Sequence, residues 1–185
     1  MVSTYENIFR EAEDILKHKI ARVRLRGYIY KLTAAVLCVS FTAWILFSVI
    51  FELEIVDGDS MSPSLRDGDM ALAYRLEEDF TYGDVVLLSG LSKDDYIKRI
   101  IGLPGDTIDI DGETGKVLRN GIILAEPYVA GPTLPREEGV DYPLQLADGE
   151  YFLLGDNRTV SCDGRVWGAT PKKNIKAKVI WPFYR

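Results

Sequence analysis

The chain has 185 residues, which is enough for one domain with a hydrophobic core and a small appendage. Its formal net charge of −6 is divided unevenly, because residues 1–31 contain seven Lys/Arg against four Asp/Glu, whereas residues 52–185 contain fifteen against twenty-four. The acidic C-terminal part excludes a nucleic-acid-binding protein, which would need a basic face.

Residues 1–31 form the first predicted element. Apolar residues such as Ile8, Ile15 and Val23 are mixed with charged residues at spacings near three and four. This pattern predicts an amphipathic helix that lies along the inner face of a membrane. The alternative is a solvated basic collar that only fixes the orientation of the chain.

Residues 32–51 carry no charge and are rich in Leu, Val, Ile and Phe. As a helix they would measure about 30 Å, the thickness of the hydrocarbon core of a bilayer, so the sequence predicts a transmembrane helix. A buried helix of a soluble protein seldom runs this long without a polar stripe. A cleavable signal peptide fits poorly, because the segment begins after residue 31 and no small-residue cleavage site follows it.

The charges on either side of this span predict its orientation. Basic residues crowd its N-terminal side and acidic residues follow it, so residues 1–31 are expected in the cytoplasm and residues 52–185 outside. The single histidine, His18, then lies inside, and Cys38 lies in the span, far from Cys162. The exterior domain is therefore expected to fold without a disulfide and to function without a histidine.

Beyond the span, short runs typical of β-strands are separated by turns rich in Gly, Asp and Asn. They predict a mostly β fold, an antiparallel sheet of the sandwich or barrel-like kind. The stretch 126–148 is rich in Pro, Gly and acidic residues, and we interpret it as an excursion from a smaller β subdomain inserted at approximately 107–150; a surface loop is the alternative. The predicted strands are 52–56, 70–74, 85–88, 96–101, 107–110, 116–118, 121–124, 151–154 and 175–181.

Ser60 is the candidate nucleophile. It lies in the stretch 56–65, where Gly58 and Pro63 predict a tight turn at the edge of a strand. A serine on such a turn can present its hydroxyl to a substrate. Taken alone, the stretch is more typical of an ordinary solvated turn.

Lys98 is the candidate general base, because an exterior site without histidine excludes a Ser-His-Asp triad. On a strand Lys98 would project among apolar neighbours while Arg99 points to the other face, and burial lowers the pKa of an amine toward neutrality. The neutral amine could then take the hydroxyl proton of Ser60. The alternative is a lysine that reaches solvent or pairs with Asp94 or Asp95.

A third stretch, 155–168, places charges and hydroxyls in a turn directly after an apolar strand. Hydrogen bonds between its Asp and Arg side chains could hold loops together, and Ser161 could orient a lysine amine. An ordinary charged hairpin would look much the same. One histidine and two separated cysteines offer no zinc site, so the sequence predicts neither a metal nor a cofactor.

Together these stretches resemble the bacterial type I signal peptidases, a family of membrane-anchored Ser-Lys endopeptidases, and in particular the Gram-positive form with a single span. The resemblance covers nearly all of residues 32–185, and the motifs keep the order of the family. The matching stretches are Gly-Asp-Ser-Met-Ser-Pro-Ser-Leu at 58–65, Tyr-Gly-Asp-Val-Val at 82–86, Lys-Arg-Ile-Ile-Gly-Leu-Pro-Gly-Asp at 98–106, and Gly-Asp-Asn-Arg at 155–158 with Ser161, Asp163 and Arg165.

The resemblance implies that Ser60 is the nucleophile and Lys98 the general base, with Ser161 hydrogen-bonded to the lysine amine. Some members carry Ser or Thr two residues before the nucleophile, where this chain has Gly58. The oxyanion hole would then rely on backbone N–H groups, chiefly that of Ser60. The resemblance also implies an apolar surface that rests on the membrane. The residues that would brace the site are Asp156, Arg158, Asp163 and Arg165.

The same resemblance implies cleavage of signal peptides after an Ala-x-Ala-type site at the outer face of the cytoplasmic membrane. The expected partners are secretory preproteins and the lipid bilayer, with no nucleic acid, and the chain is expected to be monomeric. A self-cleaving repressor-type protease is an alternative, but it would need a DNA-binding domain. A non-catalytic chaperone for exported pilin-like proteins is another, and the presence of both Ser60 and Lys98 argues against it. A membrane-anchored domain that only binds partners would leave the motifs unexplained.

Overall fold

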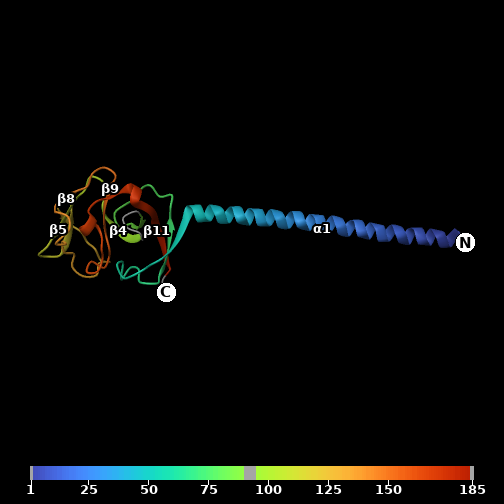
Figure 1. The fold of residues 1–185 in the computed structure, drawn as a ribbon, viewed down its shortest axis with the longest axis horizontal. Coiled ribbons are helices and arrows are strands. Elements are labelled where there is room, and N and C mark those ends of the chain that lie inside the picture. Colours follow the sequence, from blue (N-terminus) through green and yellow to red (C-terminus); the bar gives the residue numbers. More distant parts are fainter. Residues whose placement is uncertain (1, 90–94, 184–185) are drawn as a thin grey trace. The chain divides into compact units, whose positions relative to one another are not determined.

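The structure, a computed structural model, describes residues 2–89 and 95–183. It divides into two compact units, Met1–Ser48 and Val49–Arg185. Figure 1 shows the first as a helix and the second as a domain built mainly of strands. The mostly β, antiparallel fold predicted from the sequence is confirmed.

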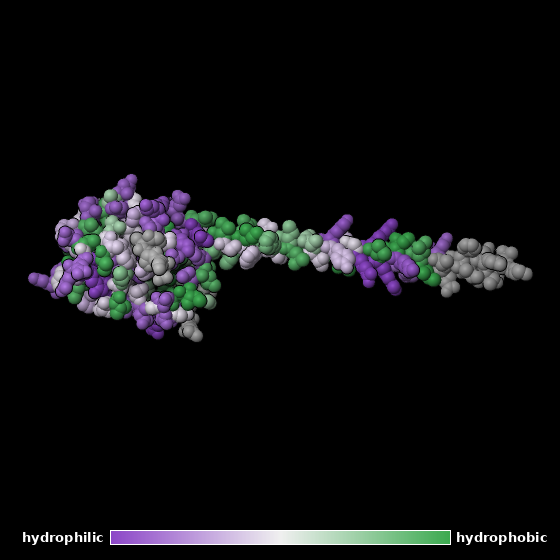
Figure 2. Space-filling view, viewed as in Figure 1, coloured by the Kyte–Doolittle hydropathy of each residue, from purple (hydrophilic) through white to green (hydrophobic). Residues whose placement is uncertain are grey.

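Helix α1 runs without a break from Val2 to Ile50. The predicted N-terminal helix and the predicted span are therefore parts of one helix. By length and composition, the portion Ile15–Ile50 could cross a membrane. Figure 2 shows mainly apolar side chains toward the C-terminal end of the helix, and a stretch of mixed charged and apolar side chains before it. The hydroxyl of Thr42 within the apolar part donates to the carbonyl of Cys38 at 2.9 Å, so the helix itself satisfies this polar group.

Seven strands form the larger sheet in the order β1-β2-β11-β3-β4-β9-β10, and all their pairs are antiparallel. The last strand of the chain, β11, lies between β2 and β3, so the sheet closes only when both ends of the domain are present. β1 is an edge strand. The strands are β1 (Phe51–Ile55), β2 (Met70–Tyr74), β3 (Val85–Leu88), β4 (Tyr96–Gly102), β9 (Glu150–Leu154), β10 (Thr170–Pro171) and β11 (Ile175–Phe183).

Four strands form the smaller sheet in the order β7-β6-β5-β8. Figure 1 shows β5 and β8 together on one side of the domain, away from β4 and β11. These strands come from residues 107–145, within the range predicted for the inserted subdomain, whose boundaries stay a prediction. The strands are β5 (Thr107–Asp111), β6 (Lys116–Arg119), β7 (Ile122–Ile123) and β8 (Leu144–Gln145); the short helices α2 (Gly164–Trp167) and η1 (Lys172–Asn174) complete the domain.

Nine of these strands match predicted ones with ends that differ by at most two residues. The remaining two, β8 and β10, are two residues long and were not predicted. The core joins the two sheets, because Ile101 of β4 and Phe152 of β9 pack with Ile108 of β5 and Val117 of β6. The larger sheet thus fixes the position of the smaller one.

Candidate active site

The stretch that follows β1 forms a closed turn around Ser60. The backbone N–H of Val56 donates to Asp69 O at 2.8 Å, and the N–H of Gly68 donates to Val56 O at 2.9 Å, so the ends of the turn meet. Gly58 has φ +78°, a conformation that glycine adopts without steric cost. Ser60 is therefore on a tight turn at the end of a strand, as the sequence predicts.

Buried side chains of the same turn fix it to the domain. Met61 and Leu65 are buried in the core with Leu87 and Ile97. The backbone N–H of Leu65 also donates to the carbonyl of Met61. The turn that carries Ser60 is thus packed on β3 and β4.

Lys98 reaches this turn from β4. Its Nζ lies 3.0 Å from Ser60 Oγ and 2.9 Å from the carbonyl oxygen of Ile97, and the residue is only 2% exposed. Burial lowers the pKa of the Lys98 amine to about 8, against the attraction of nearby acidic groups, chiefly Asp163. A large fraction of the amine is therefore neutral at mildly alkaline pH.

The alternative partner proposed for this lysine is engaged elsewhere. Asp95 accepts a hydrogen bond of 2.8 Å from Lys176, which also donates to Glu52 at 2.6 Å. Asp94 lies outside the described residues. The Lys98 amine is therefore directed at Ser60 and not at Asp95.

A cavity of about 430 Å³ opens in front of the two residues. It lies between the end of the edge strand β1 and the first residues of β4, which pair with β3 alone because pairing with β9 begins at Arg99. Among the described residues, both walls therefore offer unpaired backbone to an extended peptide. Its lining includes Ile55, Val56, Ser60, Tyr96, Ile97 and Lys98.

Ser161 lies beside this pair but makes a different contact from the one expected. Its hydroxyl donates to the carbonyl of Cys162 at 3.4 Å, and among the described residues no hydrogen bond joins it to Lys98. Gly155 separates Ser161 from the turn, since a Cβ at Gly155 would overlap Ser161 Oγ and lie 2.5 Å from Ser60 O. The role of Ser161 in orienting the lysine stays a prediction.

Asp163 and Arg165 form a buried ion pair at the start of α2. Arg165 Nε donates to Asp163 Oδ1 at 2.9 Å and Nη2 to Oδ2 at 3.0 Å. Asp163 also caps α2 by accepting from the Arg165 N–H, and it accepts from the Gly155 N–H at 3.1 Å. This pair connects the two ends of the loop 155–165, which we call the catalytic loop.

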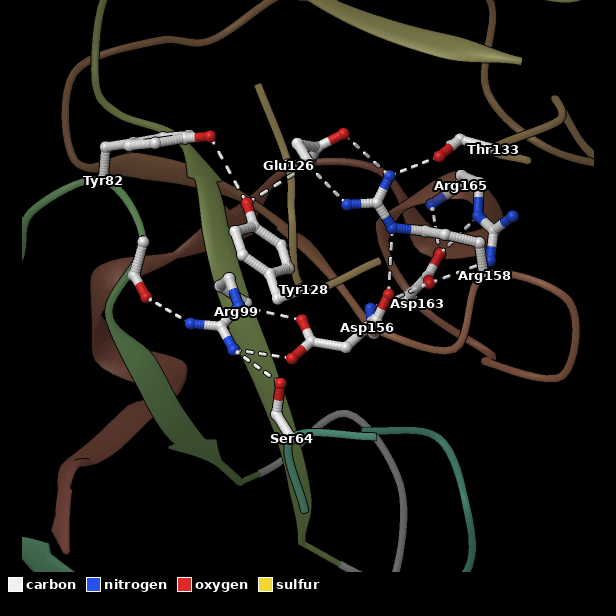
Figure 3. Close-up of polar contacts among 12 residues, drawn as sticks. Ser64, Tyr82, Arg99, Glu126, Tyr128, Thr133, Asp156, Arg158, Asp163 and Arg165 are labelled. Atoms are coloured by element: carbon white, nitrogen blue, oxygen red, sulfur yellow. Dashed lines mark hydrogen bonds and ion pairs between the residues drawn. The ribbon is translucent and has the colours of Figure 1, made fainter. Parts of the chain in front are cut away.

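Asp156 and Arg158 pair with residues outside this loop. Arg99 donates to Asp156 through Nε at 2.8 Å and through Nη2 at 2.5 Å, and its Nη2 lies 3.3 Å from Ser64 Oγ (Figure 3). Arg158 instead pairs with Glu126. The sequence pattern predicted no role for Arg99 beyond its position in a motif, and nothing in the pattern of residues 126–148 indicated a role for Glu126.

The backbone of the same loop reaches the candidate nucleophile directly. The N–H of Asn157 donates to the carbonyl of Ser60 at 3.1 Å. Lys98 and Arg99 are neighbours on β4. Lys98 contacts the serine turn at Ser60, and Arg99 contacts the catalytic loop at Asp156 and the turn at Ser64. Within residues 2–89 and 95–183 there is no group of three or more potential metal ligands.

Comparison with known proteins identifies the family. A family model described as "Signal peptidase, peptidase S26" matches residues 28–184. The chain belongs to this signal peptidase family. Because relatives in this family are named signal peptidase I, we identify the chain as a serine endopeptidase that acts in the processing of secretory proteins. The long apolar N-terminal helix is consistent with a membrane protein.

Relatives of this signal peptidase come from several bacteria. Signal peptidase I of Bacillus licheniformis is 33% identical over 175 residues, which cover 85% of this chain and 91% of the relative. A protein named probable signal peptidase I-2 from Synechocystis is 30% identical over 194 residues, covering 97% and 84%. A crystal structure of a signal peptidase I from Enterococcus faecalis is 26% identical with a TM-score of 0.46, and the similarity covers 56% of this chain and 98% of that one.

Proposed function

We propose that this signal peptidase is a membrane-anchored endopeptidase that removes signal peptides with a catalytic dyad of Ser60 and Lys98. The observation that carries the proposal is the 3.0 Å contact between Ser60 Oγ and the buried amine of Lys98. A lysine can act as a general base only when its neutral form is populated, and burial provides this condition here.

In the proposed reaction, Ser60 Oγ attacks the scissile carbonyl carbon while its proton passes to Lys98 Nζ. The resulting ammonium returns this proton to the leaving amine as the C–N bond breaks, and the new N-terminus of the mature protein departs. A water molecule, deprotonated by the same amine, then attacks the acyl carbon, and the ammonium returns the proton to Ser60 Oγ as the ester C–O bond breaks and the signal peptide departs as a carboxylate. The bond from Lys98 to the Ile97 carbonyl supports this role, because it fixes the rotamer that points the nitrogen at Ser60.

The oxyanion would be stabilised by the N–H of Ser60, held in place by the turn at Gly58. Among the hydrogen bonds of the described residues, none uses this N–H, so it is free to donate to a substrate oxygen. A backbone donor aimed at the developing charge is the usual means of stabilising such an intermediate. The absence of a hydroxyl side chain at position 58 is compatible with this arrangement.

The substrate would bind as an extended strand in the cavity between β1 and β4. The unpaired backbone of both walls supports β-augmentation, which places alternate substrate side chains against the protein. Small residues at the first and third positions before the cut, the Ala-x-Ala pattern, would point into shallow depressions of this cavity.

The membrane part of the proposal assigns residues 32–51 to the span, residues 1–31 to the cytoplasm and residues 52–185 to the outer side. The basic residues before the span and the acidic ones after it support this orientation. Anchoring enzyme and precursor in one membrane raises their effective concentration. We further propose that the chain acts as a monomer on secretory preproteins and binds no nucleic acid.

The supporting roles belong to the catalytic loop. We assign Asp163 and Arg165 to closing the loop, and Asp156 and Arg158 to holding it against β4 and the segment 126–133. Removing one partner of such a buried ion pair costs about 3–5 kcal/mol of folding free energy, because the other charge is left without compensation.

The test is cleavage of a secretory precursor with an Ala-x-Ala site by the full chain in detergent. We expect the wild type to cut after the second Ala, and Ser60→Ala and Lys98→Ala to be inactive although folded. If either variant keeps the wild-type rate, the dyad is contradicted.

A further inference from the structure

We propose that Glu126 is a positioning residue of this protease, which holds the catalytic loop against the Ser60 turn through Arg158. The inference rests on the proposed Ser60–Lys98 dyad. Glu126 lies between β7 and β8 of the smaller sheet, in a segment whose sequence shows neither regular structure nor a catalytic motif. Its role follows from the contacts that this segment makes in the folded domain.

Glu126 holds Arg158 with both carboxylate oxygens. Oε1 accepts from Nη2 at 2.5 Å and Oε2 accepts from Nη1 at 3.1 Å, and the two side chains are almost completely buried. A bidentate pair of this kind fixes the orientation of the guanidinium plane as well as its distance. Thr133, from the same segment, accepts a further bond from Arg158 Nη1.

Arg158 connects Glu126 to the start of the catalytic loop. Its Nε donates to the carbonyl of Gly155 at 3.0 Å, so the side chain reaches back over the turn that it belongs to. Without a fixed guanidinium the Gly155 carbonyl would lose this donor. The backbone adds one more tie, from the N–H of Ala130 to Asp156 O at 2.9 Å.

A second set of side-chain contacts connects Glu126 to the other side of the catalytic loop. The hydroxyl of Tyr128 donates to Glu126 Oε1 at 3.2 Å, and the Tyr128 ring lies 4.2 Å from the guanidinium carbon of Arg99. Arg99 holds Asp156. Figure 3 shows Glu126 between Tyr128 and Arg158, with Asp156 between the two arginines. Burial raises the pKa of the Tyr128 hydroxyl, which keeps it a neutral donor to the carboxylate.

The loop held in this way touches the reacting groups. Asn157 N–H supports the Ser60 carbonyl, and Gly155 is in contact with both Ser161 and the Ser60 backbone. A displacement of the Gly155 carbonyl therefore shifts Ser60 relative to Lys98. Proton transfer and attack both depend on this distance, so the loss should appear in the chemical step.

The experiment compares Glu126→Gln with wild type as full chains in detergent, measuring kcat and KM separately on folded protein. We expect kcat to fall by about 10- to 100-fold, with KM nearly unchanged, because a small misplacement of catalytic groups has an effect of this size. Glu113→Gln is the matched control, since Glu113 is an exposed glutamate of the smaller sheet's β5–β6 turn, and it should keep the wild-type kcat.

The double variant Glu126→Gln/Arg158→Lys shows whether Glu126 acts through Arg158. If it does, the double variant should have the kcat of Arg158→Lys alone, whereas independent effects would multiply. A wild-type kcat for Glu126→Gln, with or without a lower unfolding temperature, overturns the proposal. If Glu126→Gln does not fold, Glu126→Asp, which keeps the charge but shortens the side chain, is judged by the same criterion.

Ser60→Ala is measured in parallel, so that a failure of the proposed Ser60–Lys98 dyad can be distinguished from a failure of the proposed role of Glu126. If Ser60→Ala retains activity, the dyad itself is wrong. If Ser60→Ala is inactive and Glu126→Gln is as fast as wild type, only the positioning role of Glu126 is wrong.

Discussion

Lys98 combines two properties that normally exclude each other, a position in the core and a group that is charged in water. Its stem packs beside Tyr96, whose ring centre is 5.3 Å from Nζ, while the amine meets Ser60 and the Ile97 carbonyl. Burial penalises the ammonium form, so the pKa falls from 10.5 to about 8. The same desolvation that would suit Lys98 to the proposed role of general base should therefore lower the stability of the domain.

The first consequence concerns the pH dependence of the rate. Only the neutral amine of Lys98 can accept a proton, so kcat/KM should rise with pH through an apparent pKa of about 8. Below this pKa the value should fall by about tenfold per pH unit. The measurement is kcat/KM for one precursor at pH values on both sides of the pKa, and a flat profile through this range would rule out the lysine as base.

The second consequence concerns stability. The unfolded chain keeps the Lys98 proton up to pH 10.5 and the native chain only up to about 8, so the wild type gains stability as the pH rises between these values. Lys98→Met removes the buried ammonium and should stabilise the domain below pH 8 by on the order of 3 kcal/mol. This gain should shrink as the pH approaches 10.5.

Denaturant unfolding at neutral and alkaline pH measures this effect. Lys176→Met is the control, because Lys176 is paired with Glu52 and Asp95 and its pKa is raised. Its removal should lower stability at neutral pH. A Lys98→Met variant less stable than wild type at neutral pH would contradict the lowered pKa.

At the scale of elements, the site depends on the close contact between the Ser60 turn and the catalytic loop. Three strands bring the two together: β1 leads into the turn, β4 carries Lys98 and Arg99, and β9 leads into the loop. The register of β4 on β9 sets Arg99 opposite Leu154, two residues before Asp156, so the arginine can reach that carboxylate.

Gly155→Ala tests this contact. The added methyl would overlap Ser161 Oγ and approach the Ser60 carbonyl, which is backbone and cannot rotate away. We expect a loss of activity of about 100-fold or more from displacement of Ser60. Gly112→Ala is the control, because the nearest atom to its added methyl is 3.8 Å away, and activity should be retained. A fully active Gly155→Ala would mean that the loop does not determine the position of Ser60.

At the scale of the whole molecule, one face of the larger sheet is apolar and open to solvent. The register sets Leu53 of β1, Leu72 of β2 and Trp181 of β11 in one row, and Ile55 and Met70 in the next. Leu53, Ile55, Met70 and Trp181 are all exposed. An apolar face of this kind is typical of a membrane or protein interface, and we assign it to the membrane surface.

Trp181→Glu should therefore slow the cleavage of precursors in vesicles by about tenfold, because it replaces an apolar side chain at the bilayer surface with a charge. Cleavage of a soluble peptide should be unchanged. The control is Ile122→Glu, because Ile122 is also an exposed apolar residue but lies on the edge strand of the smaller sheet. Equal losses on vesicle and soluble substrates would place the effect in the domain itself and not at the membrane.

Much of this protein could be predicted from short-range pattern. The period of two in the β runs and the twenty uncharged residues from 32 to 51 are local signals, so they predicted nine strands and the apolar helix. The composition also pointed to Lys98, because residues 52–185 contain no histidine and lysine is then the expected base for Ser60.

The partners of the charged residues were decided only by tertiary structure. Spacing cannot reveal that Asp156 pairs with Arg99 and that Arg158 pairs with Glu126, because these contacts join residues 57 and 32 positions apart. They depend on strand order and register, which are set by packing of the whole core. The sequence thus determined which side chains are available for catalysis, and the fold decided which of them meet. The physical reason is that packing in one core fixes the distances between these side chains, and burial in that core lowers the pKa of Lys98.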